Sequence, residues 1–217
     1  MGRRFKKNKL VTAFVKVTGL PCLLILKPKF YYKTDKSPRR LPKPSILVSN
    51  HWSLIDMPLY WYHYLFHDLR FLVAEVMFNK NAFMNFLLFS VGCIYVDRDK
   101  YDFSFIGDAL DCLDRGESIG IFPSSRLPVN GVHFPFKPSV AIIALHTDAP
   151  VVPVYTDGNY GFFKRAHVMV GDPVDVKDLC PDSSLPENQR ARLITAELEK
   201  IVNGLGDELK KRMNKGK

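Results

Sequence analysis

Short runs rich in valine, isoleucine and leucine alternate along this chain with segments of helical periodicity. The apolar runs lie near residues 45–49, 70–74, 92–96, 118–122, 151–155 and 166–170. Helical patterns fall between and after them, near 54–67, 75–90, 101–115, 137–147 and 187–212. Strands that are apolar on both faces are typical of parallel sheets covered by helices. The alternation therefore predicts an α/β fold with a mixed, mostly parallel sheet flanked by helices.

The positive charge of the chain is concentrated at its N-terminus. The formal net charge of the 217 residues is +9, but residues 1–43 contribute +12 and the remainder −3. Residues 10–26 of this basic segment are largely apolar, with interruptions at Lys16 and Pro21. A membrane span needs about 20 predominantly apolar residues, whereas a helix rimmed by cations suits the interface of an anionic membrane. We expect residues 1–33 to form a monotopic anchor on the cytoplasmic face of the cell membrane.

Other interpretations of residues 10–26 stay open: a true span, a helix packed in the core, or a signal peptide. The last is disfavoured because no small-residue cleavage site follows Leu26. Nucleic acid is the obvious rival partner for a basic arm, but the interleaved leucine, valine and phenylalanine favour lipid. Residues 34–44, which contain three prolines and many cations, are typical of a linker. This leaves 45–217 as the catalytic domain.

The cysteines and glycines argue against several classes of site. The four cysteines are scattered without C-x2-C pairs, which argues against a zinc site and a disulfide framework. Five of the six histidines also lack a spacing typical of metal ligands. No glycine-rich phosphate loop or nucleotide fingerprint occurs. We therefore expect neither a metal nor a cofactor.

His51 and Asp56 are the strongest candidates for catalysis. A spacing of five residues on a straight helix separates two side chains by about 140°, so the pair cannot share one helical face. The apolar run ends at Asn50, and the helical pattern resumes at Leu54, with Pro58 tolerable only in a first turn. This predicts that His51 lies at a strand-to-helix junction and Asp56 at the start of the helix. A histidine oriented by a carboxylate is a general base.

Further segments follow this pair in a set order, and together they resemble the sequence blocks of the glycerolipid acyltransferase family, whose members include the PlsC-like 1-acylglycerol-3-phosphate acyltransferases. Asn50-His51-x4-Asp56 matches the family's first block, and the resemblance covers about residues 45–175. The later blocks are Gly92-Cys-Ile-Tyr-Val-Asp-Arg98, Phe122-Pro-Ser-Ser-Arg126, Ala149-Pro-Val-Val-Pro-Val154 and the strand end Val168-Met-Val-Gly-Asp-Pro-Val174.

The resemblance implies a reaction at the membrane surface. An acyl chain would pass from acyl-CoA or acyl-carrier protein to lysophosphatidic acid, giving phosphatidic acid for phospholipid synthesis. His51 would be the base and Asp56 its orienting partner. Arg98 and Arg126, which occupy matching positions, would hold the acceptor phosphate, because arginine binds phosphate in a bidentate manner. Lys137, whose match to the family is looser, is a third candidate for the phosphate.

One block departs from the family pattern. The family usually has Glu and Gly where this chain has Ser124 and Ser125. The change removes a strong acceptor for substrate hydroxyls and restricts the backbone, while serine can still donate to a phosphate or hydroxyl. Two alternatives to the expected activity follow. One is a related acyltransferase that uses another lysolipid or an amine, and the other is an inactive lipid-binding protein on the same scaffold.

Overall fold

A single mixed sheet forms the centre of the computed structural model, which describes residues 7–97, 103–161 and 163–215. Within these residues seven strands are arranged in the order β1-β7-β6-β2-β5-β3-β4. All neighbouring strands are parallel except β6 and β7. The strands are β1 (Lys29–Tyr32), β2 (Ile46–Ser49), β3 (Leu69–Ala74), β4 (Ile94–Val96), β5 (Ser118–Ile121), β6 (Val151–Thr156) and β7 (His167–Val170).

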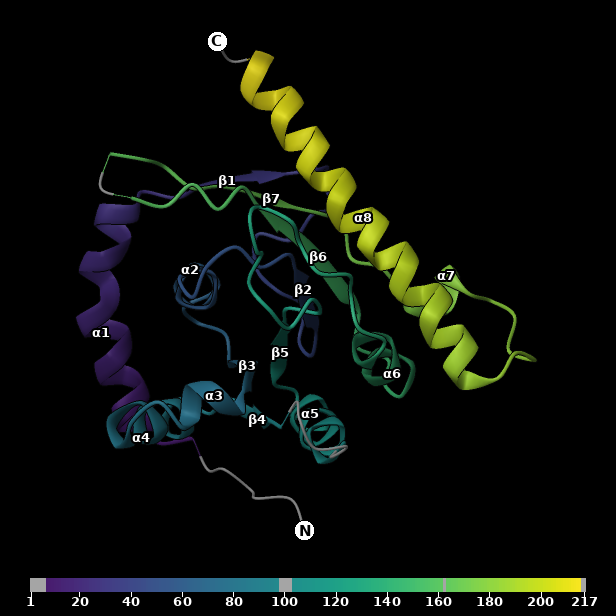
Figure 1. Ribbon diagram of the computed structural model, residues 1–217, viewed down its shortest axis with the longest axis horizontal. Coiled ribbons are helices and arrows are strands. Elements are labelled where there is room, and N and C mark those ends of the chain that lie inside the picture. The colour runs from purple at the N-terminus through teal and green to yellow at the C-terminus, as the bar shows by residue number, and fades with distance from the viewer. Residues whose placement is uncertain (1–6, 98–102, 162, 216–217) are drawn as a thin grey trace.

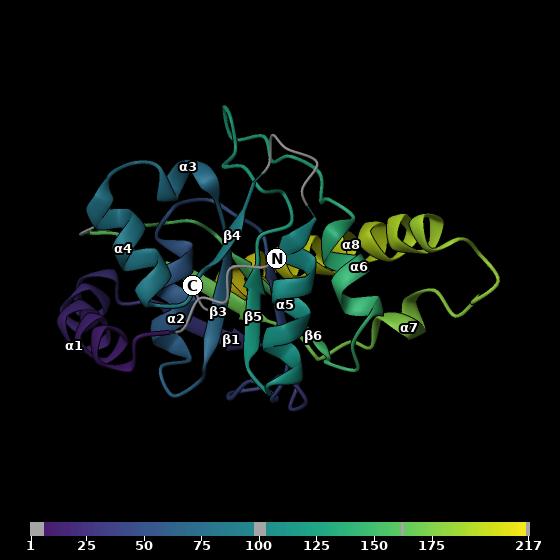
Figure 2. The same ribbon diagram turned by 90° about the horizontal axis from the view of Figure 1, so that it is seen from below.

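Helices cover both faces of this sheet (Figures 1 and 2). One face carries α5 (Ser104–Asp114), α6 (Ser139–Leu145), α7 (Val176–Leu179) and the long α8 (Glu187–Lys215). The other face carries α1 (Lys9–Leu26), α2 (Asp56–His63), α3 (Glu75–Phe78) and α4 (Ala82–Ser90). The molecule is therefore a three-layer α/β/α sandwich.

The core is divided in two by the sheet, because successive side chains of a strand point to opposite faces. On β2, Ile46 and Val48 pack with the α5–α6–α8 side, while Leu47 packs with the α2 side. All three side chains are fully buried. A central strand buried on both faces needs an unbroken apolar run, which explains the sequence of this segment.

A close approach of α8 to the sheet depends on Gly206. A Cβ at this position would lie 2.6 Å from the ring of Tyr155 on β6, so a larger residue would push the helix outward. Beyond this contact, Leu205 and Leu209 pack on Met169 of β7. The C-terminal half of α8 thus covers the β6–β7 part of the sheet.

The predicted fold class is confirmed, and each of the six predicted strands overlaps an observed one. The helix predicted over 75–90 is instead two helices, α3 and α4, because the side chain of Asn81 accepts a hydrogen bond from Met84 N at 2.7 Å and caps a new helix. Strand β1 and helix α7 were not expected. Short segments of this kind carry little periodicity for a sequence pattern to reveal.

The N-terminal segment packs against the rest of the protein. The Tyr62 hydroxyl on α2 donates to the carbonyl of Val15 at 2.7 Å, and Thr12 donates to Ser90 O on α4 at 3.3 Å. Residues 29–32, which we assigned to the anchor, pair with β7 as β1. Among the described residues, no helix has the length and apolarity to cross a membrane.

The segment assigned as a linker, residues 34–44, is also in contact with the sheet. The hydroxyls of Thr34 and Ser37 donate to Oδ1 of Asp172 at 2.6 and 2.7 Å. Leu41 is buried in the core of the α2 side. Asp172 belongs to the Gly-Asp-Pro strand end noted in the sequence, so its carboxylate holds this segment in place.

Candidate active site

The candidate site begins where β2 ends, and Asn50 fixes that end. Its side-chain oxygen accepts from Thr156 N at 2.9 Å, and its side-chain nitrogen donates to Thr156 O at 2.8 Å. The amide thereby continues the β2–β6 pairing for one more residue at the carboxyl edge of the sheet. Ligands of open α/β sheets bind at this edge. Asn50 therefore sets the position from which His51 leaves the sheet.

His51 and Asp56 are in direct contact, as their spacing predicted. Nδ1 of His51 lies 2.8 Å from Oδ2 of Asp56. Asp56 is the first residue of α2, and the intervening turn folds back so that the two side chains meet. The His51 side chain is 14% exposed and Asp56 is fully buried. Nε2 of His51 has no hydrogen-bond partner among the described residues, so this nitrogen is available to a substrate.

The carboxylate of Asp56 is held by several donors. The backbone N–H groups of Trp52 and Ser53 donate to Oδ2 at 2.7 and 2.8 Å. The hydroxyl of Tyr160 donates to the other oxygen, Oδ1. A buried carboxylate with this many donors has its acceptor sites satisfied and its orientation fixed. It can therefore fix the Nδ1–H tautomer of His51 and balance the charge of an imidazolium.

Phe122 forms one wall of the site. It follows β5, at the same edge of the sheet as His51, and opens the third sequence block. Its ring is stacked on the imidazole with centroids 4.3 Å apart and 16° between the planes. The ring of Phe71 is also stacked on Phe122, with 5.6 Å between centroids. The stack restricts rotation of His51 and places the third block beside the base.

The two serines of that block have different environments. Ser125 has φ of 52°, in the left-handed region that favours glycine, and this is the position where the family usually has Gly. Ser124 is 2% exposed, and its hydroxyl donates to the carbonyl of Arg126 at 3.3 Å. The loop keeps the backbone shape expected of a glycine, while the Ser124 side chain is occupied within its own turn.

Arg126 and Lys137 are both exposed and lie on segments that meet. The guanidinium of Arg126 is 5.8 Å from the ring of Phe134, and Lys137 N donates to the carbonyl of Pro123 at 3.0 Å. The intervening chain folds back through a tight turn at Asn130-Gly131, both with positive φ. Arg98 lies outside the described residues.

Comparison with known proteins agrees with this arrangement. The model of a family described as acyltransferase matches residues 31–157, which is more than half of the chain and includes both His51 and Phe122. The chain belongs to the acyltransferase family.

Named relatives of this acyltransferase-family chain share about a quarter of their residues with it. The 1-acyl-sn-glycerol-3-phosphate acyltransferase alpha of Ovis aries is 26% identical over 78% of this chain and 64% of the relative. The 1-acyl-sn-glycerol-3-phosphate acyltransferase of Bacillus subtilis is 24% identical over 76% of this chain and 82% of the relative. The chain thus spans less than two thirds of the length of the sheep protein.

A solved structure supports the same fold. The crystal structure of the 1-acyl-sn-glycerophosphate acyltransferase PlsC from Thermotoga maritima superposes with a TM-score of 0.62 at 21% identity. The match covers 95% of this chain and 84% of that chain. The α/β/α sandwich is therefore the fold of a structurally known acyltransferase.

Two residues beside the acyltransferase-family pair were missed by sequence reasoning. Tyr160 contacts Asp56, and His133 lies with its ring edge-on to Trp52 at 4.3 Å. Burial lowers the pKa of His133, with the charge of Asp56 acting in the opposite direction. Both residues reach the site from loops, so no strand or helix periodicity marks them.

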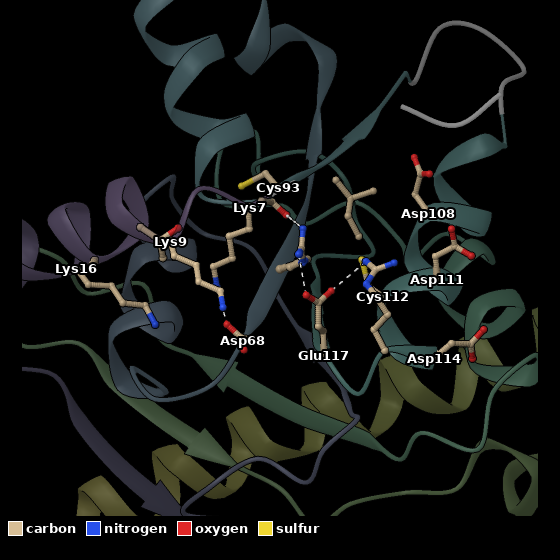
Figure 3. A pocket seen from close by; sticks show the side chains of 16 residues that line it. Lys7, Lys9, Lys16, Asp68, Cys93, Asp108, Asp111, Cys112, Asp114 and Glu117 are labelled. Atoms are coloured by element: carbon tan, nitrogen blue, oxygen red, sulfur yellow. Dashed lines mark hydrogen bonds and ion pairs between the residues drawn. The ribbon is translucent and has the colours of Figure 1, made fainter. Parts of the chain in front are cut away.

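A cavity of about 990 Å³ lies at the opposite edge of the sheet (Figure 3). Cations from the N-terminal segment line one side, and Asp108, Asp111 and Asp114 of α5 line the other. Between them, the carboxylate of Glu117 forms ion pairs with Arg70 at 2.7 Å and with Arg115 at 3.1 Å. Glu117 directly precedes β5, whereas His51 comes after the carboxyl end of the parallel β2, separated from it only by Asn50. The cavity is therefore separate from the base.

Residues 7–97, 103–161 and 163–215 contain no group of three or more His, Cys, Asp or Glu side chains arranged to hold a metal ion. The candidate site consists of a histidine–carboxylate pair, an aromatic wall and exposed cations. This set of groups is suited to proton transfer and anion binding.

Proposed function

We propose that this protein transfers an acyl chain from acyl-CoA or acyl-carrier protein to the free hydroxyl of lysophosphatidic acid, giving phosphatidic acid. The observation that carries the proposal is the contact between His51 Nδ1 and Asp56 Oδ2, with Nε2 left for a substrate. Membership of the acyltransferase family and the names of its relatives support the same reaction.

His51 acts as the general base in this reaction. Its Nε2 takes the proton of the acceptor hydroxyl while the hydroxyl oxygen attacks the thioester carbonyl. A C–O bond forms, the C–S bond then breaks, and the imidazolium returns its proton to the departing thiolate. Asp56 keeps the proton on Nδ1 at the start and stabilises the imidazolium in between. The products are the new ester and a free thiol.

Arg126 and Lys137 bind the phosphate of the acceptor in this proposal. Both are exposed, and the bond from Lys137 N to Pro123 O joins their segments beside the Phe122 wall. Guanidinium groups bind phosphate oxygens in a bidentate manner, and lysine adds a point charge. Arg98 serves the same purpose on the grounds of its sequence block. A phosphate held near the base leaves the adjacent glycerol hydroxyl within reach of His51.

The reaction takes place at a membrane surface, and α1 is the element that contacts it. Leu10, Phe14 and Val17 are 83%, 68% and 67% exposed and recur at helical spacing on one face. The opposite side of α1 faces α2 and α4 through the bonds described above. An exposed apolar stripe beside lysines is typical of helices that lie in the interface of an anionic leaflet. For this protein we infer the cytoplasmic face of the cell membrane.

The decisive experiment compares wild-type protein with His51→Ala. Both are incubated with an acyl thioester and a panel of lysolipids in vesicles, and released thiol and product mass are measured. General-base catalysis supplies about 10²–10⁴-fold, so turnover to phosphatidic acid is expected to fall by at least that factor without loss of folding. Wild-type-like turnover in the variant would refute the mechanism. No thiol release with any acceptor, together with retained lipid binding, would favour an inactive lipid-binding scaffold.

The choice of acceptor rests on the third block. Because the Ser124 hydroxyl is bonded to Arg126 O within its own turn, a related activity toward another lysolipid or an amine is the second candidate. Ser124→Glu tests it. A large gain on lysophosphatidic acid would mean that the native pocket is adapted to a different acceptor. Unchanged preference would mean that serine is a tolerated variation in a lysophosphatidic-acid enzyme.

A further inference from the structure

Tyr160, in the loop that follows β6, contacts the His51–Asp56 pair although it is distant from it in sequence. Its hydroxyl donates to Oδ1 of Asp56, although the two residues are 104 positions apart. The same hydroxyl lies 3.3 Å from Oγ1 of Thr156, the last residue of β6. Oδ2, the other oxygen of Asp56, is the one that contacts His51. The two oxygens of the carboxylate therefore have separate partners.

The loop that carries Tyr160 is fixed at both ends of its turn. Asp157 accepts from His167 N at 3.0 Å and from His167 Nδ1 at 2.9 Å, which ties the loop to β7. Gly158 has φ of 66°, and a Cβ there would lie 2.4 Å from Cγ of Trp52. The loop thus packs directly on the turn between His51 and Asp56. This close packing holds Tyr160 at the carboxylate.

The hydroxyl of Tyr160 keeps its proton in this position. Burial raises the pKa of Tyr160, and the nearby charge of Asp56 raises it further. A neutral phenol beside an ionised carboxylate is a hydrogen-bond donor. Such a bond withdraws charge from the carboxylate and prevents its rotation.

We propose that Tyr160 is a positioning residue that holds Asp56 through Oδ1, so that Oδ2 stays on Nδ1 of His51. The inference rests on the proposed role of His51 as the base. Loss of the hydroxyl returns charge to the carboxylate, which then stabilises the imidazolium more strongly. Loss of the Tyr160 hydroxyl is therefore expected to raise the proton affinity of His51 relative to wild type.

Other ionisable groups surround the pair. His133 faces it from the loop that precedes α6, Tyr60 from α2, and Asp157 from the loop after β6. Asp157 is paired with His167. The hydroxyl of Tyr60, which is fully buried, lies 2.7 Å from Ser49 Oγ. Tyr60→Phe therefore removes a buried phenol close to the same carboxylate and serves as the matched control.

The test is a histidine NMR titration of wild type, Tyr160→Phe and Tyr60→Phe, with the His51 signal identified by its absence in His51→Gln. We expect the pKa of His51 to rise by about 0.5–1 unit in Tyr160→Phe, where one unit is a tenfold change in proton affinity. Tyr60→Phe is expected to leave it within about 0.2 unit on the same scale. The acid limb of the pH profile of kcat/KM should move by the same amount as the titration.

A second substitution is expected to shift the pKa of His51 in the opposite direction, so the test does not depend on one variant. Incorporation of 3-fluorotyrosine in place of Tyr160 makes the phenol a stronger donor, so the pKa of His51 should fall below that of wild type. An unchanged His51 pKa in folded Tyr160→Phe, or equal shifts in both phenylalanine variants, would overturn the proposal. The titration needs no substrate. A shifted pKa in a protein inactive toward every lysolipid would therefore reject the proposed function and retain the role of Tyr160.

Discussion

The imidazole of His51 is stacked on the ring of Phe122, with 4.3 Å between centroids and 16° between planes. The two residues leave the sheet from neighbouring strands, β2 and β5, which run parallel. A flat ring against the imidazole restricts its rotation about the Cβ–Cγ bond, while Asp56 fixes one nitrogen. The remaining nitrogen is thus held in one direction by two independent contacts.

Phe122→Leu should reduce activity more than stability. Leucine fills much of the volume but cannot stack, so His51 gains rotational freedom, and we expect kcat/KM to fall by about tenfold, since small displacements of a catalytic group are costly. The expected loss of unfolding free energy is only about 1 kcal/mol. Phe78→Leu is the control, because Phe78 is more deeply buried than Phe122 and its ring packs at a tilt on Phe89 and Tyr95. Equal kcat/KM losses in the two variants would contradict a role for the stack.

Ser125→Gly should stabilise the protein. Ser125 has φ of 52°, and relief of left-handed strain exceeds the extra entropy of glycine in the unfolded chain by about 0.5–1 kcal/mol. The melting temperature should rise by about 2 °C for a chain of this size. Ser124→Gly, made one residue earlier, should lower it, because that change removes the bond to Arg126 O without relieving strain. A lower melting temperature for Ser125→Gly would contradict this account.

Glu117→Gln should destabilise the protein in a pH-dependent way. Burial alone would raise the pKa of Glu117, but hydrogen bonds and charge from Arg70 and Arg115 hold it below the ordinary value of 4.5. A lowered folded-state pKa contributes stability that is fully present above about pH 4.5 and is lost as pH falls through the folded pKa. At pH 7 we expect a loss of about 2 kcal/mol, since Arg70 is buried and loses a charged partner.

Denaturant unfolding of wild type and Glu117→Gln at several pH values between 3 and 7 measures this difference. The two stabilities should converge at the acid end of the series. Glu187→Gln is a control, because its carboxylate is half exposed and pairs with an exposed His146 at 3.6 Å. A difference for Glu117→Gln that does not change with pH would mean that the charge is not its cause.

Substitution of the exposed face of α1 should weaken membrane binding. Phe14→Ser removes an apolar side chain that would be buried in the interface, and about 1.5–3 kcal/mol of transfer free energy corresponds to at least a tenfold loss of affinity. Flotation with anionic vesicles measures the bound fraction. Leu193→Ser on α8 is the control, because Leu193 is 46% exposed on the opposite side of the sheet. Equal binding by all three proteins would exclude α1 as the membrane contact.

The sequence alone was sufficient to predict the fold class and the His51–Asp56 contact, because both depend on interactions between residues that are close in the chain. Unbroken apolar runs such as Ile46–Val48 belong to strands buried on both faces, and their alternation with helical periodicity fixes the layer type. The spacing of His51 and Asp56 across a strand end and a helix start was enough to predict their contact, because a single turn brings them together. Ser125 has a positive φ at the position where the family usually has glycine, the residue that adopts this conformation most easily.

Only the tertiary structure decided which distant segments meet at that pair. Parallel strands end at one edge of a sheet, so the order of β2, β5 and β6 brings Phe122 and Tyr160 to His51 and Asp56. Neither contact has a local signature, because each depends on a strand order set by packing over the whole chain. For the same reason β1 was missed: four residues pair with β7 only because that edge lies open to them. Local sequence determined the helices, the strands and the His51–Asp56 pair, whereas long-range packing placed Phe122 and Tyr160 beside that pair.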